Sequence, residues 1–111
     1  MKILHGKLIR DRIPEILTKK GISFQLEEVA GEKLLAVLKQ KLLEEAQEAD
    51  DASSREELLA ELADLQEVID ALLVQSKSSA AELRRLQDKK RAERGAFEKG
   101  FCLLWTEKPE Q

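Results

Sequence analysis

The sequence predicts a mainly α-helical bundle with a small two-stranded sheet. Three observations indicate this fold class: leucines recur at helical spacing, residues that can cap helices precede the apolar segments, and strict alternation is confined to two short stretches. The chain has 111 residues, the size of one domain, and no linker rich in proline, glycine or serine divides it. We therefore expect a single helical domain over residues 1–111.

The first thirty residues predict a short helix and a strand. Asp11 can cap a helix that has Pro14 in its first turn, continues through Leu17 and closes before Gly21. Apolar and polar residues then alternate over residues 22–26, which is typical of a strand.

Two long helices joined by a short turn come next. The first starts at Gly31, ends near residues 51–54, and has an apolar stripe of Leu34, Leu38, Leu42 and Ala49. Ser53 or Ser54 can cap the second helix, whose main stripe is Leu58, Leu62, Leu65, Ile69 and Leu72. The second helix is apolar around more of its circumference than one neighbour covers, so we expect association with a second copy of the chain.

A third long helix and a second strand complete the predicted elements. Ser78 or Ser79 can cap a segment rich in arginine and lysine that stops at Gly95. Residues 101–105 alternate again and predict a strand that pairs with residues 22–26 and leans on the helices, because two strands alone are marginal in water.

Composition excludes several classes of protein. With 42% hydrophobic and 37% charged residues, the chain is too apolar for a disordered polyelectrolyte and too charged for a membrane span. The lone cysteine, Cys102, cannot form an internal disulfide, and we expect a packed thiol in a reducing cytoplasm. The basic helix interleaves acids and offers no aromatic platform, so no nucleic-acid partner is expected.

Charge is distributed unevenly along the chain. Residues 44–70 contain eleven acidic residues and one basic residue, Arg55, whereas the rest of the chain has 18 basic and 11 acidic residues. Two interpretations are open: an acidic helical hairpin that is merely solvated, or a cation site flanked by basic ends that bind an anionic ligand.

Four acids occupy informative positions on the two long helices. Glu45 lies about 20° from Leu38 on its helix, inside the apolar stripe, so its carboxylate should be at least partly buried. Glu48 flanks it one turn on, and Glu61 and Asp64 edge the stripe of the next helix. On an antiparallel hairpin these pairs match in height to about 3 Å, so the four carboxylates can converge. Their repulsion requires protons or a cation, and their oxygens suit Mg²⁺ or Mn²⁺.

Basic residues near both ends could bind the phosphates that usually complete the shell of such an ion. The candidates are Lys7, Arg10, Arg12, Lys89, Lys90, Arg91, Arg94 and Lys99. Arg94 stands apart because the turn that follows it at Gly95 could fix its direction.

Three sequence blocks resemble a known family. Residues 7–16, 41–48 and 57–72 are similar to the MazG-like, all-α nucleoside triphosphate pyrophosphohydrolases, in particular the small branch akin to phosphoribosyl-ATP pyrophosphohydrolase. Residues 94–97 are similar to the closing Arg-Gly-Gly-Phe of that branch, except that Ala96 replaces the second glycine.

The resemblance implies a Mg²⁺-dependent hydrolysis of a nucleoside triphosphate, ordinary or noncanonical, to the monophosphate and pyrophosphate. It implies that Glu45, Glu48, Glu61 and Asp64 hold the ion, for which Mn²⁺ can substitute. Glu44 or Glu48 would accept the proton of the attacking water, and Lys7, Arg10 and Arg94 would contact phosphates. The family's bundle is completed by dimerisation, sometimes as a dimer of dimers. The alternative is a non-catalytic helical dimerisation or adaptor module with a solvated acidic hairpin.

Overall fold

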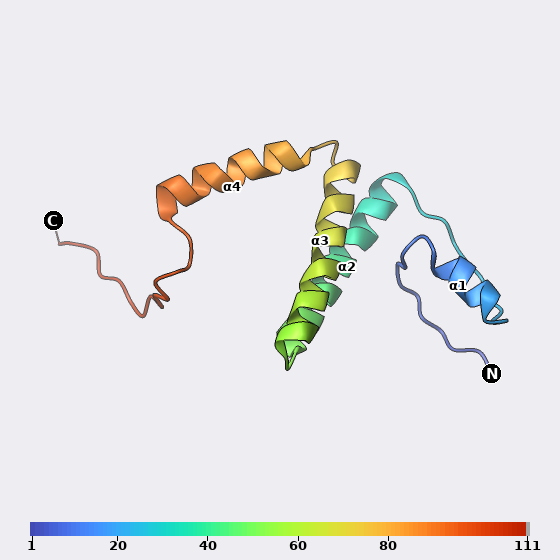
Figure 1. Ribbon diagram of the computed structural model, residues 1–111. Helices are drawn as coiled ribbons and strands as arrows, with labels where there is room; N and C mark the ends of the chain where they lie inside the picture. Colours follow the sequence, from blue (N-terminus) through green and yellow to red (C-terminus); the bar gives the residue numbers. More distant parts are fainter. Residues whose placement is uncertain (111) are drawn as a thin grey trace. The chain divides into compact units, whose positions relative to one another are not determined.

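The computed structural model describes residues 1–110 and is mainly α-helical, as predicted (Figure 1). Its helices are α1 (Ile13–Lys19), α2 (Gly31–Asp51), α3 (Arg55–Gln75) and α4 (Ala80–Arg94). Contacts along the chain separate two compact units, Met1–Ala80 and the part of the chain that follows. The first unit contains the long acidic helices, and the second contains most of the basic helix.

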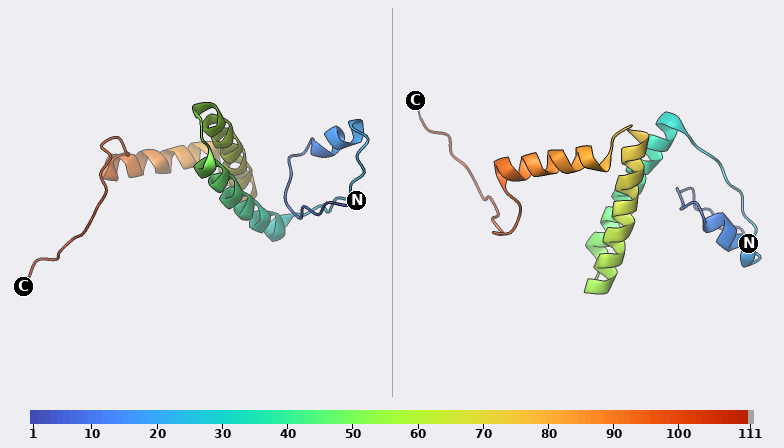
Figure 2. Two further views of the ribbon diagram at one scale, coloured as in Figure 1. Left: turned by 90° about the horizontal axis from the view of Figure 1, so that it is seen from below. Right: turned by 45° about the horizontal axis from the view of Figure 1, so that its top comes forward.

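Helices α2 and α3 form an antiparallel hairpin because only residues 52–54 connect them, and both views show them side by side (Figures 1 and 2). The bounds of both helices agree with the prediction. Ser54 is the N-cap of α3, where its hydroxyl accepts a hydrogen bond from the Glu57 backbone N–H at 3.1 Å. The Glu57 carboxylate in turn accepts hydrogen bonds from the Ser53 backbone N–H at 3.0 Å and the Ser53 hydroxyl at 3.1 Å. Together the contacts of Ser53 and Ser54 with Glu57 fix the start of α3.

The seam between α2 and α3 takes in only part of the predicted α3 stripe, of which Leu65, Ile69 and Leu72 are half-buried. Leu38 on α2 and Val68 on α3 are the buried apolar residues of the described chain, only 5% and 8% exposed. On α3, by contrast, Leu58 and Leu62 of the predicted stripe are 42% and 45% exposed. Helix α2 covers the side of α3 that carries Val68 and the acids, so the start of the leucine stripe is left without a cover.

Helix α1 begins at Ile13, one residue later than a cap at Asp11 would place it. Arg12, not Asp11, occupies the N-cap position, and no side chain caps the helix, so the prediction of an Asp11 cap is wrong. Pro14 does lie in the first turn. The helix closes at Gly21, whose φ of +71° is available to glycine at low cost, and the N–H of Ile22 bonds the Leu17 carbonyl at 3.0 Å.

The predicted two-stranded sheet is absent from residues 1–110, which contain no strand. Ile22, Phe24 and Leu26 are 43–51% exposed, and Phe101, Leu103 and Trp105 are 73–85% exposed. Alternation indicates an extended chain with two different faces, but a strand also needs a partner for its backbone groups, and a lone ribbon gains too little from pairing. Cys102 is likewise exposed rather than packed.

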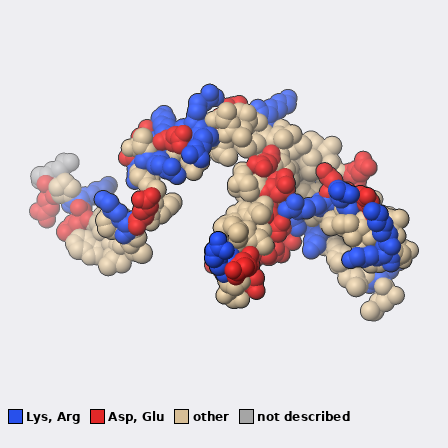
Figure 3. Space-filling model, in the orientation of Figure 1, with Lys and Arg blue, Asp and Glu red and all other residues tan. Residues whose placement is uncertain are grey.

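The second unit contains the predicted basic helix. Helix α4 ends where Gly95 takes a φ of +82° and donates a 2.8 Å hydrogen bond to the Arg91 carbonyl. No residue of α4 is buried, and lysine and arginine side chains gather along it (Figure 3). In the part of the chain that the structure describes, no helix is long and apolar enough to cross a membrane.

Candidate metal centre

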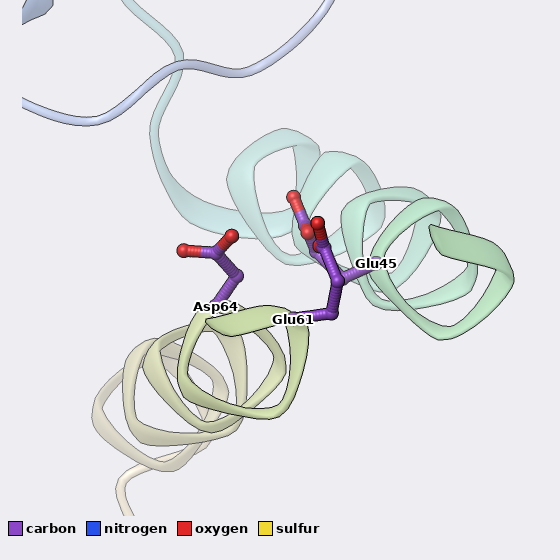
Figure 4. A group of neighbouring side chains, drawn as sticks. All are labelled: Glu45, Glu61 and Asp64. Carbon is purple, nitrogen blue, oxygen red and sulfur yellow. The ribbon is translucent and has the colours of Figure 1, made fainter. Parts of the chain in front are cut away.

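Three carboxylates converge between α2 and α3. Glu45 extends from α2 and Glu61 and Asp64 extend from α3, and one oxygen of each lies within 4.8 Å of the others (Figure 4). The turn at residues 52–54 places the two helices antiparallel, which brings these positions to the same height. The i,i+3 spacing of Glu61 and Asp64 directs both side chains toward α2. These three residues are called the carboxylate cluster below.

Two oxygens of the carboxylate cluster are buried without a hydrogen-bond partner among residues 1–110, Oε2 of Glu45 and Oε2 of Glu61. Glu45 as a whole is only 6% exposed, so its predicted burial is confirmed. A buried acceptor without a donor is costly, and a carboxylate more so. Oxygens of this kind, supplied by three carboxylates, are a fitting ligand set for Mg²⁺ or Mn²⁺.

Burial raises the pKa of the Glu45 carboxyl, and the neighbouring Glu48 carboxyl raises it further by competing for the same proton and by its charge. The Lys41 ammonium opposes this, but the pKa remains above its ordinary value. When the Glu45 carboxyl is ionised, its Oε2 has no hydrogen-bond donor among residues 1–110. A cation would satisfy the same oxygen at neutral pH.

Glu48 lies beside the cluster rather than within it. Its side chain is exposed, interacts with Glu45, and lines an open recess together with Asp51, Glu57 and Glu61. The structure thus brings Glu45, Glu61 and Asp64 together and places Glu48 next to them, one helical turn beyond Glu45.

Lys41 is the main internal counter-charge on α2. Its Nζ lies 3.3 Å from Glu45 Oε1 and 3.2 Å from Glu44 Oε1, and its side chain is only 17% exposed. Lys7 also approaches Glu44, at 3.9 Å. Sequence reasoning did not assign Lys41 a role, although its spacing of three and four residues from the two acids is the usual one for ion pairs on a helix.

Arg10 contacts the carboxylate cluster from the segment before α1. Its Nη2 donates a 2.6 Å hydrogen bond to Asp64 Oδ1, and its Nη1 lies 3.7 Å from Glu67 Oε1. Glu67 is thus a second acidic partner of Arg10 on α3. Arg12, the N-cap residue of α1, instead pairs with Glu15 in that helix, at 3.1 Å.

The predicted phosphate contacts fall in both units. Lys7 and Arg10 contact acids of the α2–α3 hairpin, whereas Arg94 is the last residue of α4 in the second unit. Lys7 and Lys41 also line a second recess together with Gly6, Gln40 and Glu44. Within the first unit, therefore, ammonium and guanidinium groups lie directly beside the carboxylates.

No family model, curated protein or solved structure matches this chain. The resemblance to MazG-like pyrophosphohydrolases therefore depends on the motif blocks alone, and the assignment stays a prediction.

Proposed function

We propose that this chain is a Mg²⁺-dependent nucleoside triphosphate pyrophosphohydrolase, which hydrolyses a ribo- or deoxyribonucleoside triphosphate, ordinary or noncanonical, to the monophosphate and pyrophosphate. The observation that carries the proposal is the carboxylate cluster with its two buried, unpartnered oxygens. The motif blocks, which resemble such hydrolases, supply the reaction.

Glu45, Glu61 and Asp64 would hold the ion, and Glu48 would join them from the next turn of α2. Mg²⁺, when bound, would offset the charge of the phosphate chain and make water a better nucleophile at neutral pH. All four ligands are carboxylates, so the site would favour a hard cation that still keeps positions open for phosphate oxygens.

Glu48 is better placed than Glu44 to accept the proton of the attacking water. Glu44 Oε1 is already contacted by the ammonium groups of Lys41 and Lys7. Glu48 makes no ion pair among those found in the described residues and borders the recess next to Glu61. Lys7 and Arg10 lie near enough to the acids of the α2–α3 hairpin to bind phosphate oxygens.

Pyrophosphate release from a panel of ordinary and modified triphosphates tests the proposal directly. We expect Mg²⁺-dependent release that EDTA abolishes and that Asp64→Asn lowers by more than about 100-fold, beyond what loss of an outer contact costs. Asp70→Asn is the matched control, because Asp70 is exposed on the same helix and accepts a hydrogen bond only from Gln66, at 2.9 Å, among the contacts found. A folded protein that releases no pyrophosphate from any member of the panel would refute the activity.

We further propose that the chain works as a homodimer or a dimer of dimers. One copy buries only Leu38 and Val68 among its described apolar residues, whereas Leu58, Leu59 and Leu62 of α3 are 42–57% exposed. A second copy that covered this leucine face would supply the missing core. Sedimentation should show that Leu59→Lys lowers the number of chains in the assembly. Glu56→Lys is the control and should leave that number unchanged, because the Glu56 side chain on the same helix is exposed.

The same leucine face favours the alternative of a helical dimerisation or adaptor module without catalysis. In that case the acids would be solvated, Glu61→Gln would not impair function, and Mg²⁺ would change the melting temperature only through screening. A bound ion instead stabilises the folded state by mass action, by about 2.7 kcal/mol at a hundredfold excess over its Kd. Melting curves with and without Mg²⁺ therefore separate the two functions. In either case we place the chain in a reducing cytoplasm, where the exposed thiol of Cys102 stays free.

A further inference from the structure

We propose that Arg10 is an exchangeable counter-cation of the carboxylate cluster, which leaves Asp64 for phosphate oxygens when a divalent cation and a polyphosphate bind together. The consequence is a site that binds cation and polyphosphate cooperatively and binds the cation alone weakly. This inference rests on the metal site proposed above and adds a device that controls its occupancy.

The geometry makes Arg10 a direct competitor of a cation. Asp64 belongs to the carboxylate cluster, and its Oδ1 accepts the 2.6 Å hydrogen bond from Arg10. The same guanidinium reaches Glu67, so it spans two acids one turn apart on α3. A cation held by Asp64 would take from Arg10 the closer of its two acidic partners. The cation would also repel the guanidinium that remains nearby.

The contact is also one that can exchange. The side chains of Arg10 and Asp64 are 55% and 41% exposed, and an ion pair so open to water is held only weakly. Lys41 provides the contrast, because its side chain is 17% exposed and is enclosed between Glu44 and Glu45. Lys41 therefore acts as a permanent counter-charge, whereas Arg10 can be released at small cost.

Polyphosphate is the ligand that would compensate Arg10 for the loss of Asp64. A guanidinium binds phosphate oxygens through two parallel hydrogen bonds, and phosphate groups bridge readily to a divalent ion. A cation alone displaces Arg10 from Asp64 and leaves the guanidinium without a replacement anion. A cation with polyphosphate supplies that anion. Since coupling free energies are reciprocal, each of the two ligands then raises the affinity for the other.

The experiment compares two affinities of the full chain, one for Mn²⁺ alone and one for the preformed complex of Mn²⁺ with inorganic tripolyphosphate. We expect Arg10→Gln to tighten Mn²⁺ binding by about two- to fivefold, the range of a half-exposed ion pair, and to weaken binding of the complex. Arg10→Lys, which keeps the charge, should restore weak Mn²⁺ binding. Arg55→Gln is the matched control, because Arg55 pairs with Glu56 alone among the contacts found and its side chain is 82% exposed, and it should change neither affinity.

The opposite signs of the two effects distinguish the inference from simpler roles. If Arg10→Gln weakened both affinities, Arg10 would be structural, and if it left Mn²⁺ binding unchanged, Arg10 would be only a phosphate contact; either result overturns the inference and leaves the metal site standing. If neither the wild-type chain nor Arg10→Gln bound Mn²⁺, while far-ultraviolet circular dichroism showed both folded, the proposed metal site would fall together with the inference.

Discussion

Lys41 Nζ lies 3.3 Å from Glu45 Oε1, one turn away on α2, while the other oxygen of the same carboxylate, Oε2, is buried without a partner among residues 1–110. Only one of the two carboxylate oxygens of Glu45 is therefore paired with a positive charge. One oxygen has an ammonium group, and the other is buried with no hydrogen-bond donor among residues 1–110. This imbalance governs how the metal-free protein should respond to pH and to substitution.

Glu45→Gln should stabilise the metal-free protein at neutral pH. Because burial and Glu48 raise the pKa of Glu45, the protonated carboxyl contributes stability that is fully present below the ordinary pKa of 4.5 and is lost as the pH rises through the raised value. The amide avoids that loss. Melting temperatures in EDTA across the pH range should show the variant above wild type at neutral pH and level with it in acid.

Glu56→Gln is the control for this pH profile, since the Glu56 side chain is 80% exposed at the start of α3. It should show no such crossover. A gain for Glu45→Gln that was the same at every pH would mean that the ionisation of Glu45 is not the cause.

Lys41→Met should destabilise the metal-free protein by about 1–3 kcal/mol, because it leaves mostly buried carboxylate oxygens without their cation. The contacts with Glu44 and Glu45 outweigh the effect of burial and raise the pKa of Lys41, which shows that the folded protein favours the charged ammonium. Chemical denaturation in EDTA measures the loss. In the double variant Lys41→Met/Glu45→Gln much of the lost unfolding free energy should be recovered. Strict additivity of the two changes would contradict the pairing of Lys41 with Glu45.

Glu57→Gln should lower stability at neutral pH but not in acid. The backbone N–H of Ser53, followed by its hydroxyl, holds the pKa of Glu57 below its ordinary value. That stabilisation is present above the ordinary pKa and is lost as the pH falls through the lowered one. Denaturation midpoints of wild type and variant should therefore converge as the pH falls; equal separation at all pH values would exclude this cap contact as the source.

Leu38→Ala should cost about 2–4 kcal/mol of unfolding free energy, because Leu38 is 5% exposed in a very small core. Leu43→Ala, on the same helix but 72% exposed, should change stability by less than about 0.5 kcal/mol in a single copy of the chain. A large loss for Leu43→Ala would indicate that a second chain covers this position, and dilution should then reduce that loss.

Local patterns in the sequence predicted the helices well. The α2 stripe, the serine cap of α3 and the glycines that close α1 and α4 depend on residues within one or two turns of each other, so the chain itself contains the necessary information. Residues 22–26 and 101–105 were different, because alternation does not specify a pairing partner and none is present in residues 1–110. Leu58 and Leu62, at the start of the predicted α3 stripe, are exposed because periodicity does not say which apolar side a single neighbour covers.

For the candidate site, the sequence alone determined that Glu45 lies in the buried face of α2, because helical geometry fixes its phase relative to Leu38. Only the tertiary structure decided which charges meet. Arg10 reaches Asp64 across 54 positions of sequence, and Lys41 leaves one oxygen of Glu45 unpaired. Helical phase is a property of neighbouring residues, whereas the match between an acid and a distant base depends on where the turns of the chain bring the two together.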